Sequence, residues 1–132
     1  MTLRGIGAMS KDQTGIKWLR EPEEHDYAAA RSYLSLTFDG VRAGRYVRRL
    51  ARSSVTEFKA KDIFRASALS LLGISNAHVE RDRRKIRSGT QLSPLLLVRD
   101  TIHGKVIIAD GYHRLCAVYG YDEDAMIPCK IV

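Results

Sequence analysis

The chain has 132 residues, of which 45% are hydrophobic and 28% charged, and its formal net charge is +7. This length suits one compact domain, and the composition excludes a low-complexity or wholly disordered chain. The sequence has no apolar run near the ~20 residues of a membrane span, no secretory signal and only two cysteines, so we expect a cytoplasmic protein without a membrane partner.

The first residues predict a loose arm followed by a helix. Residues 1–20 show no clear periodicity, and Trp18 is the side chain that we expect to pin them to the domain. Within residues 21–39, apolar side chains recur at helical spacing, and Asp26 is the expected N-cap. The apolar positions of this predicted helix are Tyr27, Ala30, Leu34 and Phe38.

Residues 41–52 predict a second helix, and one face of it is basic. Four arginines lie three and four residues apart on that face: Arg42, Arg45, Arg49 and Arg52. Residues 42–99 as a whole hold 14 of the 22 basic residues but only four acidic ones. Such a face suits phosphate groups of a nucleic acid, and it is also typical of an ordinary solvated surface.

The middle of the sequence predicts a short strand and two helices. Residues 55–58 alternate like a strand, and the apolar stretch 66–72 indicates a short helix ended by Gly73. Ser75 or Asn76 then caps the next helix, which ends at Gly89.

The last third has the clearest pattern. The apolar runs 94–98 and 105–109 predict two strands separated by a turn, and the first has the composition of a strand buried on both faces. A helix over 112–119, stopped by Gly120, and a strand over 127–132 follow. The order indicates a mixed α/β domain of the α+β type, with residues 21–52 as a helical extension of the same compact unit.

The candidate site lies where the second of these strands ends and the helix begins, in the sequence VIIADGYHR. The free N–H groups at a helix N-terminus attract anions, and Gly111 permits a positive φ and a close backbone approach. Tyr112, His113 and Arg114 complete the predicted phosphate site, in which arginine suits bidentate contacts. Asp110 is a candidate base or metal ligand, with His113 as a second catalytic candidate, and the alternative role of Asp110 is that of an N-cap.

With these residues and the order of the elements, residues 53–132 resemble the ParB N-terminal/sulfiredoxin-like superfamily. The resemblance implies a small sheet with flanking helices and a site at the strand-to-helix turn. ParB domains have a Gly-Glu-Arg-Arg motif there, whereas this chain has Gly111, Tyr112, His113 and Arg114. Sulfiredoxins have Gly-Cys-His-Arg, so Tyr112 stands in place of their nucleophile. Free-serine kinases of this fold have a motif similar to Asp-Gly-His-His-Arg, which this chain matches best.

The resemblance implies further ligand-binding residues in two loops. Lys61, Asp62 and Arg65 follow the first strand, on the side where the phosphates are expected. Gln91 and Ser93 lie in a segment that corresponds to a nucleotide-contacting loop of ParB.

Three function classes remain open at this point. The first is a module that binds a phosphate-bearing ligand, such as CTP, ATP or ADP with Mg²⁺. The second is an enzyme, either a small-molecule phosphotransferase or a ParB-like nuclease. The third is an adaptor that binds nucleic acid or protein through the basic helix face, and a homo-oligomer is compatible with each class.

Overall fold

The computed structural model describes residues 15–73 and 75–132, which form a mixed α+β structure with five helices and a four-stranded mixed sheet. The helices are α2 (Glu24–Leu34), α3 (Gly40–Arg52), α4 (Ala60–Ser67), α5 (Ala77–Ser88) and α6 (Tyr112–Tyr121). The strands are β1 (Thr56–Lys59), β2 (Leu95–Asp100), β3 (Lys105–Asp110) and β4 (Met126–Ile131).

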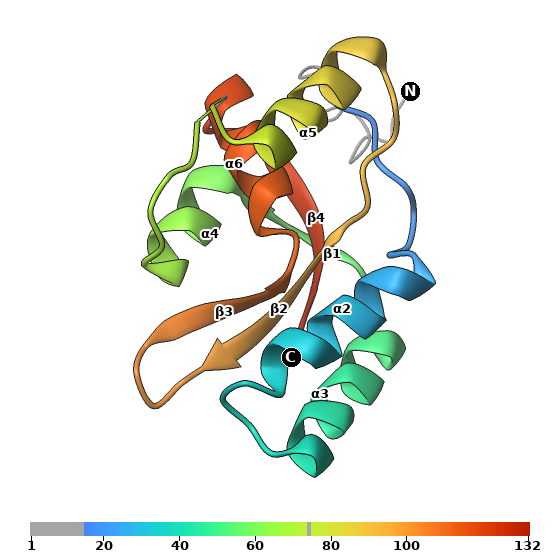
Figure 1. Ribbon diagram of the computed structural model, residues 1–132, viewed down its shortest axis with the longest axis vertical. Coiled ribbons are helices and arrows are strands. Elements are labelled where there is room, and N and C mark those ends of the chain that lie inside the picture. Colours follow the sequence, from blue (N-terminus) through green and yellow to red (C-terminus); the bar gives the residue numbers. More distant parts are fainter. Residues whose placement is uncertain (1–14, 74) are drawn as a thin grey trace.

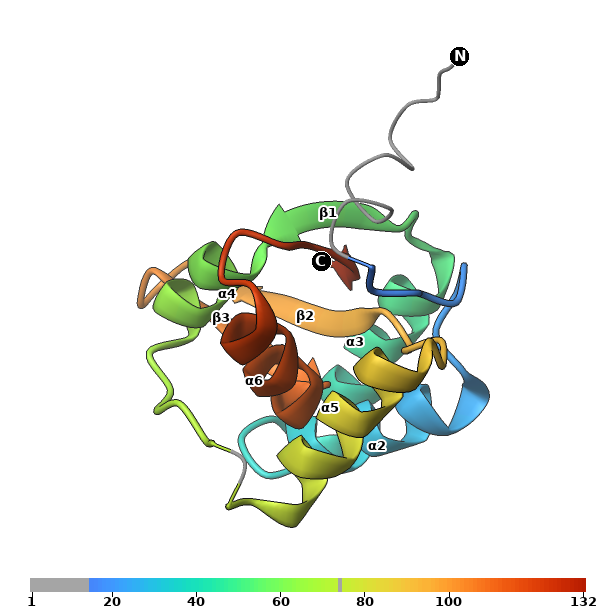
Figure 2. The ribbon, with the colours of Figure 1, turned by 90° about the horizontal axis from the view of Figure 1, so that it is seen from above.

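The sheet has the strand order β1-β4-β2-β3 and separates two hydrophobic cores. Strand β2 pairs parallel with β4 and antiparallel with β3, and β1 pairs antiparallel with β4. Leu95 and Leu97 of β2 belong to the core under α4, α5 and α6, whereas Leu96 and Val98 belong to the core under α2 and α3 (Figures 1 and 2). The prediction that this strand is buried on both faces is confirmed.

The segment before α2 is attached to the domain through a backbone bridge. Trp18 pairs with Leu92, and the Leu19 N–H donates to the Leu92 carbonyl at 2.8 Å. Trp18 is also buried, so the predicted pinning by this side chain is confirmed. The rest of the predicted arm, residues 1–14, lies outside the described residues.

The first predicted helix exists but is shorter than expected. It begins at Glu24 and ends at Leu34, and its N-cap is Glu23 rather than Asp26. Asp26 lies three residues inside the helix start, and its carboxylate accepts the Glu23 N–H at 2.8 Å. The N-cap prediction for Asp26 is therefore wrong, because the helix starts earlier than the apolar spacing alone indicates.

The short helix predicted over 66–72 is also wrong. Helix α4 starts directly after β1, because Ala60 and Ile63 lie at helical spacing and are buried. It ends at Ser67, and the C-cap residue Ala68 has a left-handed φ of 57°. Leu69 and Leu71 beyond it are exposed. The run beyond α4 thus forms a connection rather than a helix, and of its leucines Leu72 packs against the core.

The other predicted helices agree with the structure within one or two residues. In α5 the Asn76 side chain caps the helix by accepting the N–H groups of His78 and Val79, and Gly89 ends it in the left-handed conformation. Helix α6 continues through Gly120 to Tyr121. None of the helices in the described residues is long and apolar enough to span a membrane.

Candidate functional site

The strand-to-helix turn between β3 and α6 requires glycine at position 111. Gly111 has a φ of 108°, which is the left-handed region that side chains rarely adopt. A Cβ atom there would lie 2.7 Å from Leu95 Cγ and 3.0 Å from Arg114 Nη2. The close approach brings the start of α6 against the start of β2, as the sequence predicted for this glycine.

Two carboxylates share the guanidinium group of Arg114 beside this turn. Arg114 Nη2 lies 2.9 Å from Asp110 Oδ2, and Nη1 lies 4.0 Å from Asp26 Oδ1. Arg114 also donates to the Pro94 carbonyl at 3.4 Å. Because Gly111 is the N-cap of α6, the alternative that Asp110 caps this helix is wrong.

The cluster of Arg114, Asp110 and Asp26 has more negative than positive charge when both carboxyl groups are ionised. Burial raises the pKa of Asp110, the Arg114 guanidinium opposes that rise, and the Asp26 carboxylate adds to it. The Asp26 side chain is only 3% exposed, so its charge is poorly screened by water. One guanidinium therefore balances only one of the two carboxylate charges, and a further cation or proton can balance the other.

These residues lie on a polar pocket of about 270 Å³. Its lining side chains come from the start of α6, from α5 and from the segment at the start of α2. Figures 1 and 2 show how these helices lie relative to the sheet. Its basic and imidazole side chains are Arg81, Lys85, Arg114, His25 and His113, and its acidic side chains are Glu23, Asp26, Asp82 and Asp110. The pocket thus combines both signs of charge in a small volume.

The pocket also presents unused hydrogen-bond donors. Among the described residues, no acceptor is bonded to the backbone N–H of Tyr112, His113 or Arg114, the first turn of α6. The Nε of Arg114 is buried and has no partner there either. Such donors at the positive end of a helix dipole suit a bound anion.

His113 lies at the edge of the pocket against α5. Its ring centroid is 4.8 Å from that of His78 and 5.6 Å from that of Tyr112. Burial lowers the pKa of His113, and the neighbouring His78 lowers it further. His113 is therefore expected to be neutral at pH 7, which leaves it able to accept or to donate a proton.

This environment predicts a measurable change when His78 is replaced. In His78→Gln the pKa of His113 should rise toward that of a free imidazole, because a repelling neighbour is removed. Because the folded-state pKa of His113 is depressed, the neutral imidazole favours the folded state. This contribution to stability is present above the unfolded-state pKa and is lost as the pH falls through the folded-state pKa. Titration of the imidazole C–H signals by NMR tests the shift, with His103→Gln in the β2–β3 turn as control. An unchanged His113 titration in His78→Gln would contradict the assigned cause.

The other predicted ligand residues fall into two groups. Gln91 and Ser93 line the pocket, but their side chains also hold the N-terminal segment. Gln91 donates to the Trp18 carbonyl at 3.3 Å, and Ser93 donates to Glu23 at 3.0 Å. Tyr112 lines the pocket as well, and its hydroxyl donates to the Ser70 carbonyl in the loop after α4.

The three residues predicted after the first strand do not line this pocket. Lys61 is paired with Asp124 at 2.7 Å, and Arg65 lies 3.8 Å from Asp62. Asp62 lines a different cavity, beside β2 and β3. Helix α4 begins immediately after β1, so these three residues lie on that helix. Their side chains are therefore directed away from the start of α6.

The sequence did not identify the pocket residues contributed by other helices. They are Glu23, His25, Asp26, Arg81, Asp82 and Lys85. The acidic sequence EPEEHD was a usable signal, because it places several carboxylates at one point of the chain. Glu23, His25 and Asp26 place their ligand atoms within 4.8 Å of one another, and carboxylate oxygens are the donors that Mg²⁺ prefers.

Both cysteines are buried and lie outside the pocket. Burial raises the pKa of the Cys116 thiol, and it raises the pKa of Cys129 to about 12. Thiols of this kind are protonated at neutral pH and react slowly. Cys116 belongs to the main hydrophobic core.

In three comparisons with known proteins, no family model, no curated protein and no solved structure matched this chain.

Proposed function

We propose that the chain is a binding module for a phosphate-bearing ligand, such as a nucleotide, at the polar pocket beside α6. The observation that carries the proposal is the first turn of α6, which lines the pocket and whose N–H groups have no bonded acceptor among the described residues. A phosphate group supplies the acceptors that these donors lack. Gly111 removes the Cβ atom that would disturb the close packing of this turn.

The mixed charge of the pocket favours a phosphate that arrives with a divalent cation. Arg81 has no carboxylate within ion-pair distance among the described residues, and its Nη2 instead lies 2.8 Å from His78 Nδ1. Arg81 and Arg114 suit phosphate oxygens, whereas Glu23, Asp26 and Asp110 suit Mg²⁺. A bare anion would be repelled by these carboxylates, and a magnesium-bound nucleotide would not.

We also propose that residues 53–132 form a domain of the ParB/sulfiredoxin-like superfamily, which they resemble in sequence. The mixed sheet and the turn from Asp110 to Arg114 support it. An enzymatic alternative, a phosphotransferase or nuclease with Asp110 as base and His113 as second catalytic group, has less support. The Oδ2 atom of Asp110 is paired with Arg114 at 2.9 Å, and this ion pair stabilises the ionised carboxylate and so weakens Asp110 as a base.

A thermal-shift screen tests the proposed function. CTP, ATP, ADP and inorganic phosphate are each added with and without Mg²⁺, and a ligand at 100 times its dissociation constant stabilises by about 2.7 kcal/mol. We expect the largest shift with a nucleotide and Mg²⁺ together. Arg81→Ala should reduce that shift, and Arg84→Ala, on the same helix but outside the pocket, should not. Equal responses of the two variants, or no shift with any of the four ligands, would overturn the proposal.

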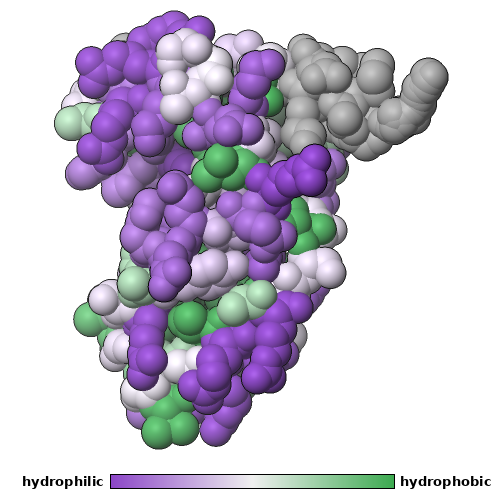
Figure 3. Space-filling model, turned by 90° about the vertical axis from the view of Figure 1, so that its right-hand side faces the viewer, coloured by the Kyte–Doolittle hydropathy of each residue, from purple (hydrophilic) through white to green (hydrophobic). Residues whose placement is uncertain are grey.

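A second candidate function rests on the arginines of α3. All of Arg42, Arg45, Arg48, Arg49 and Arg52 are exposed, and none of the described carboxylates lies within ion-pair distance of them. A groove of about 680 Å³ runs between this helix and Arg31. Figure 3 views this side of the molecule, and its lower part, where α3 lies, carries extended hydrophilic surface with small apolar patches. We propose nucleic-acid binding as the role of this face.

Salt dependence gives the test of this second candidate. Each phosphate contact releases condensed counterions, so the affinity for a DNA duplex should fall steeply as salt rises. Replacing Arg45 and Arg49 together by Ala should lower the slope of log affinity against log salt by about two. Replacing Arg84 and Arg87 of α5 in the same way provides the control. Fluorescence anisotropy measures the slopes. An absence of DNA binding at low salt would contradict this second proposal and leave α3 with an ordinary solvated face.

A further inference from the structure

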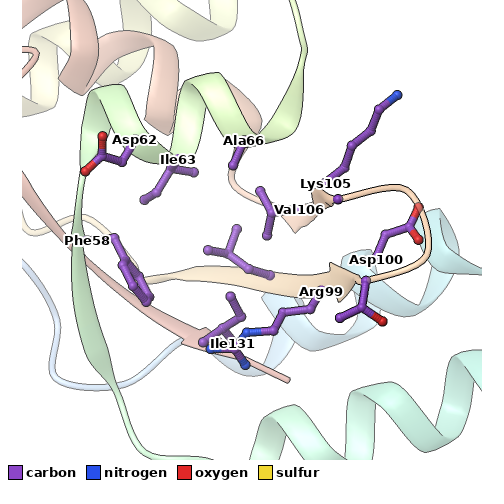
Figure 4. A pocket seen from close by; sticks show the side chains of 12 residues that line it. Phe58, Asp62, Ile63, Ala66, Arg99, Asp100, Lys105, Val106 and Ile131 are labelled. Atoms are coloured by element: carbon purple, nitrogen blue, oxygen red, sulfur yellow. The ribbon is translucent and has the colours of Figure 1, made fainter.

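A second cavity lies at the opposite side of the sheet from α2 and α3, and the proposed function does not use it. Its volume is about 390 Å³, within the range typical of small-molecule sites. It lies between α4 and the hairpin of β2 and β3, where the helices leave part of the sheet uncovered (Figure 4). The strand ends and the β2–β3 turn form its rim.

The cavity has an apolar floor that continues the main core. The apolar side chains of its lining are Phe58, Ile63, Ala66, Leu97, Val106 and Ile131. Leu97 and Ile63 are buried members of the core itself, and Phe58 remains 37% exposed at the edge. This surface is the kind that holds a ring or a short aliphatic chain away from water.

One charged side chain interrupts the apolar pattern of the central strand. Residues 95, 97 and 99 of β2 point to the same face of the sheet, because successive side chains alternate. The first two are buried leucines, whereas the third is Arg99. In Figure 4 its side chain extends along the cavity toward Ile131, while the side chain of Lys105 points away.

The positive charge of Arg99 is not neutralised within the described residues. No carboxylate there lies within ion-pair distance of Arg99 or Lys105. The two acidic residues of the lining are turned elsewhere. Asp100 binds His103 at 2.8 Å, and Asp62 points out of the cavity toward solvent in Figure 4.

From these observations we propose that this cavity binds a small organic anion with an apolar body, an aromatic or short aliphatic carboxylic acid. The apolar part lies on the floor formed with Leu97 and Val106, and the carboxylate pairs with the guanidinium of Arg99. An arginine is suited to this role because its planar fork matches both oxygens of a carboxylate. The site is separate from the polar pocket beside α6, so either proposal can fail without the other.

An NMR titration of the full chain with 4-phenylbutyrate and with 4-phenylbutan-1-ol tests the proposal. The two probes share the apolar body, and only the first carries the carboxylate. Both should shift the amide signals of Leu97, Val106 and Ile131, and the carboxylate should bind about tenfold or more tightly than the alcohol.

Two variants and one control make the outcome decisive. Arg99→Gln should lower the affinity for the carboxylate to that for the alcohol, and Ala66→Trp should abolish binding of both by filling the cavity. Arg84→Gln, at an exposed position of α5 outside the cavity, should leave both affinities unchanged. Equal affinities of the two probes, an unchanged affinity in Arg99→Gln, or shifts confined to other residues would overturn the proposal. The dispersed amide spectrum of each variant reports whether it is folded.

Discussion

Gly111→Ala should destabilise the protein by about 3 kcal/mol or more and should abolish ligand binding at the polar pocket. Two costs combine in this variant. The φ of 108° is unfavourable for alanine, and the new Cβ would meet Leu95 Cγ at 2.7 Å. Leu95 is fully buried, so it cannot move aside without disturbing the core. Urea unfolding measures the loss of stability.

Gly104→Ala is the matched control for this variant. Gly104 also has a positive φ, 64°, but nothing lies within 4 Å of its Cβ position. The Gly104→Ala variant should therefore lose only about 1 kcal/mol of unfolding free energy, which is the cost of the left-handed backbone conformation for alanine. If both variants lost the same free energy of unfolding, the close contact between the turn and Leu95 would not be the reason for glycine at position 111.

Arg114→Ala should cost about 3 kcal/mol of stability, because it leaves the carboxylates of Asp110 and Asp26 together without their shared cation. The Arg114 and Asp110 side chains are each only 16% exposed, so water replaces the guanidinium poorly. Replacing the exposed Arg84 by Ala should change the stability by less than about 0.5 kcal/mol. Chemical unfolding at pH 7 compares the two variants.

The pH dependence of this variant separates charge from lost packing. Removal of the guanidinium raises the folded-state pKa of Asp110 further above its unfolded value. A carboxyl with a raised folded pKa favours the folded state when protonated, so the deficit of Arg114→Ala should shrink as the pH falls from 7 toward 4. The double variant with Asp110→Ala should also be less destabilised than the sum of the single changes. If the loss of stability in Arg114→Ala were the same at every pH, and if the effects of the two substitutions simply added, lost packing alone would explain the result.

The sequence predicts most of the sheet because its signals are local. The apolar run in β2 and the β-branched run in β3 have strand length and turn signals at their ends. Asn76 and Gly89 likewise mark the ends of α5 by their own chemistry. The apolar stretch before Gly73 misled the prediction, because Leu69 and Leu71 are exposed although they belong to an apolar run.

The candidate site is predictable only in its central part. Asp110 to Arg114 are contiguous, and their position between a strand and a helix is visible in the sequence. The partners from α2 and α5 depend on how helices far apart in the sequence pack on the sheet. Asp26 illustrates the difficulty, because its position suits a helix cap, whereas its carboxylate accepts the Glu23 N–H and lies 4.0 Å from Arg114.

The central claim is that the first turn of α6 holds a phosphate group. The most direct measurement is a titration of the ¹⁵N-labelled chain with CTP and Mg²⁺ and, in parallel, with inorganic pyrophosphate and Mg²⁺. If the claim is right, the amide signals of Tyr112 and His113 move most, because their N–H groups acquire an acceptor, and Arg81→Ala weakens the response while Arg84→Ala does not. Amide signals of residues 111–114 that stay in place at saturating concentrations of both ligands would contradict it.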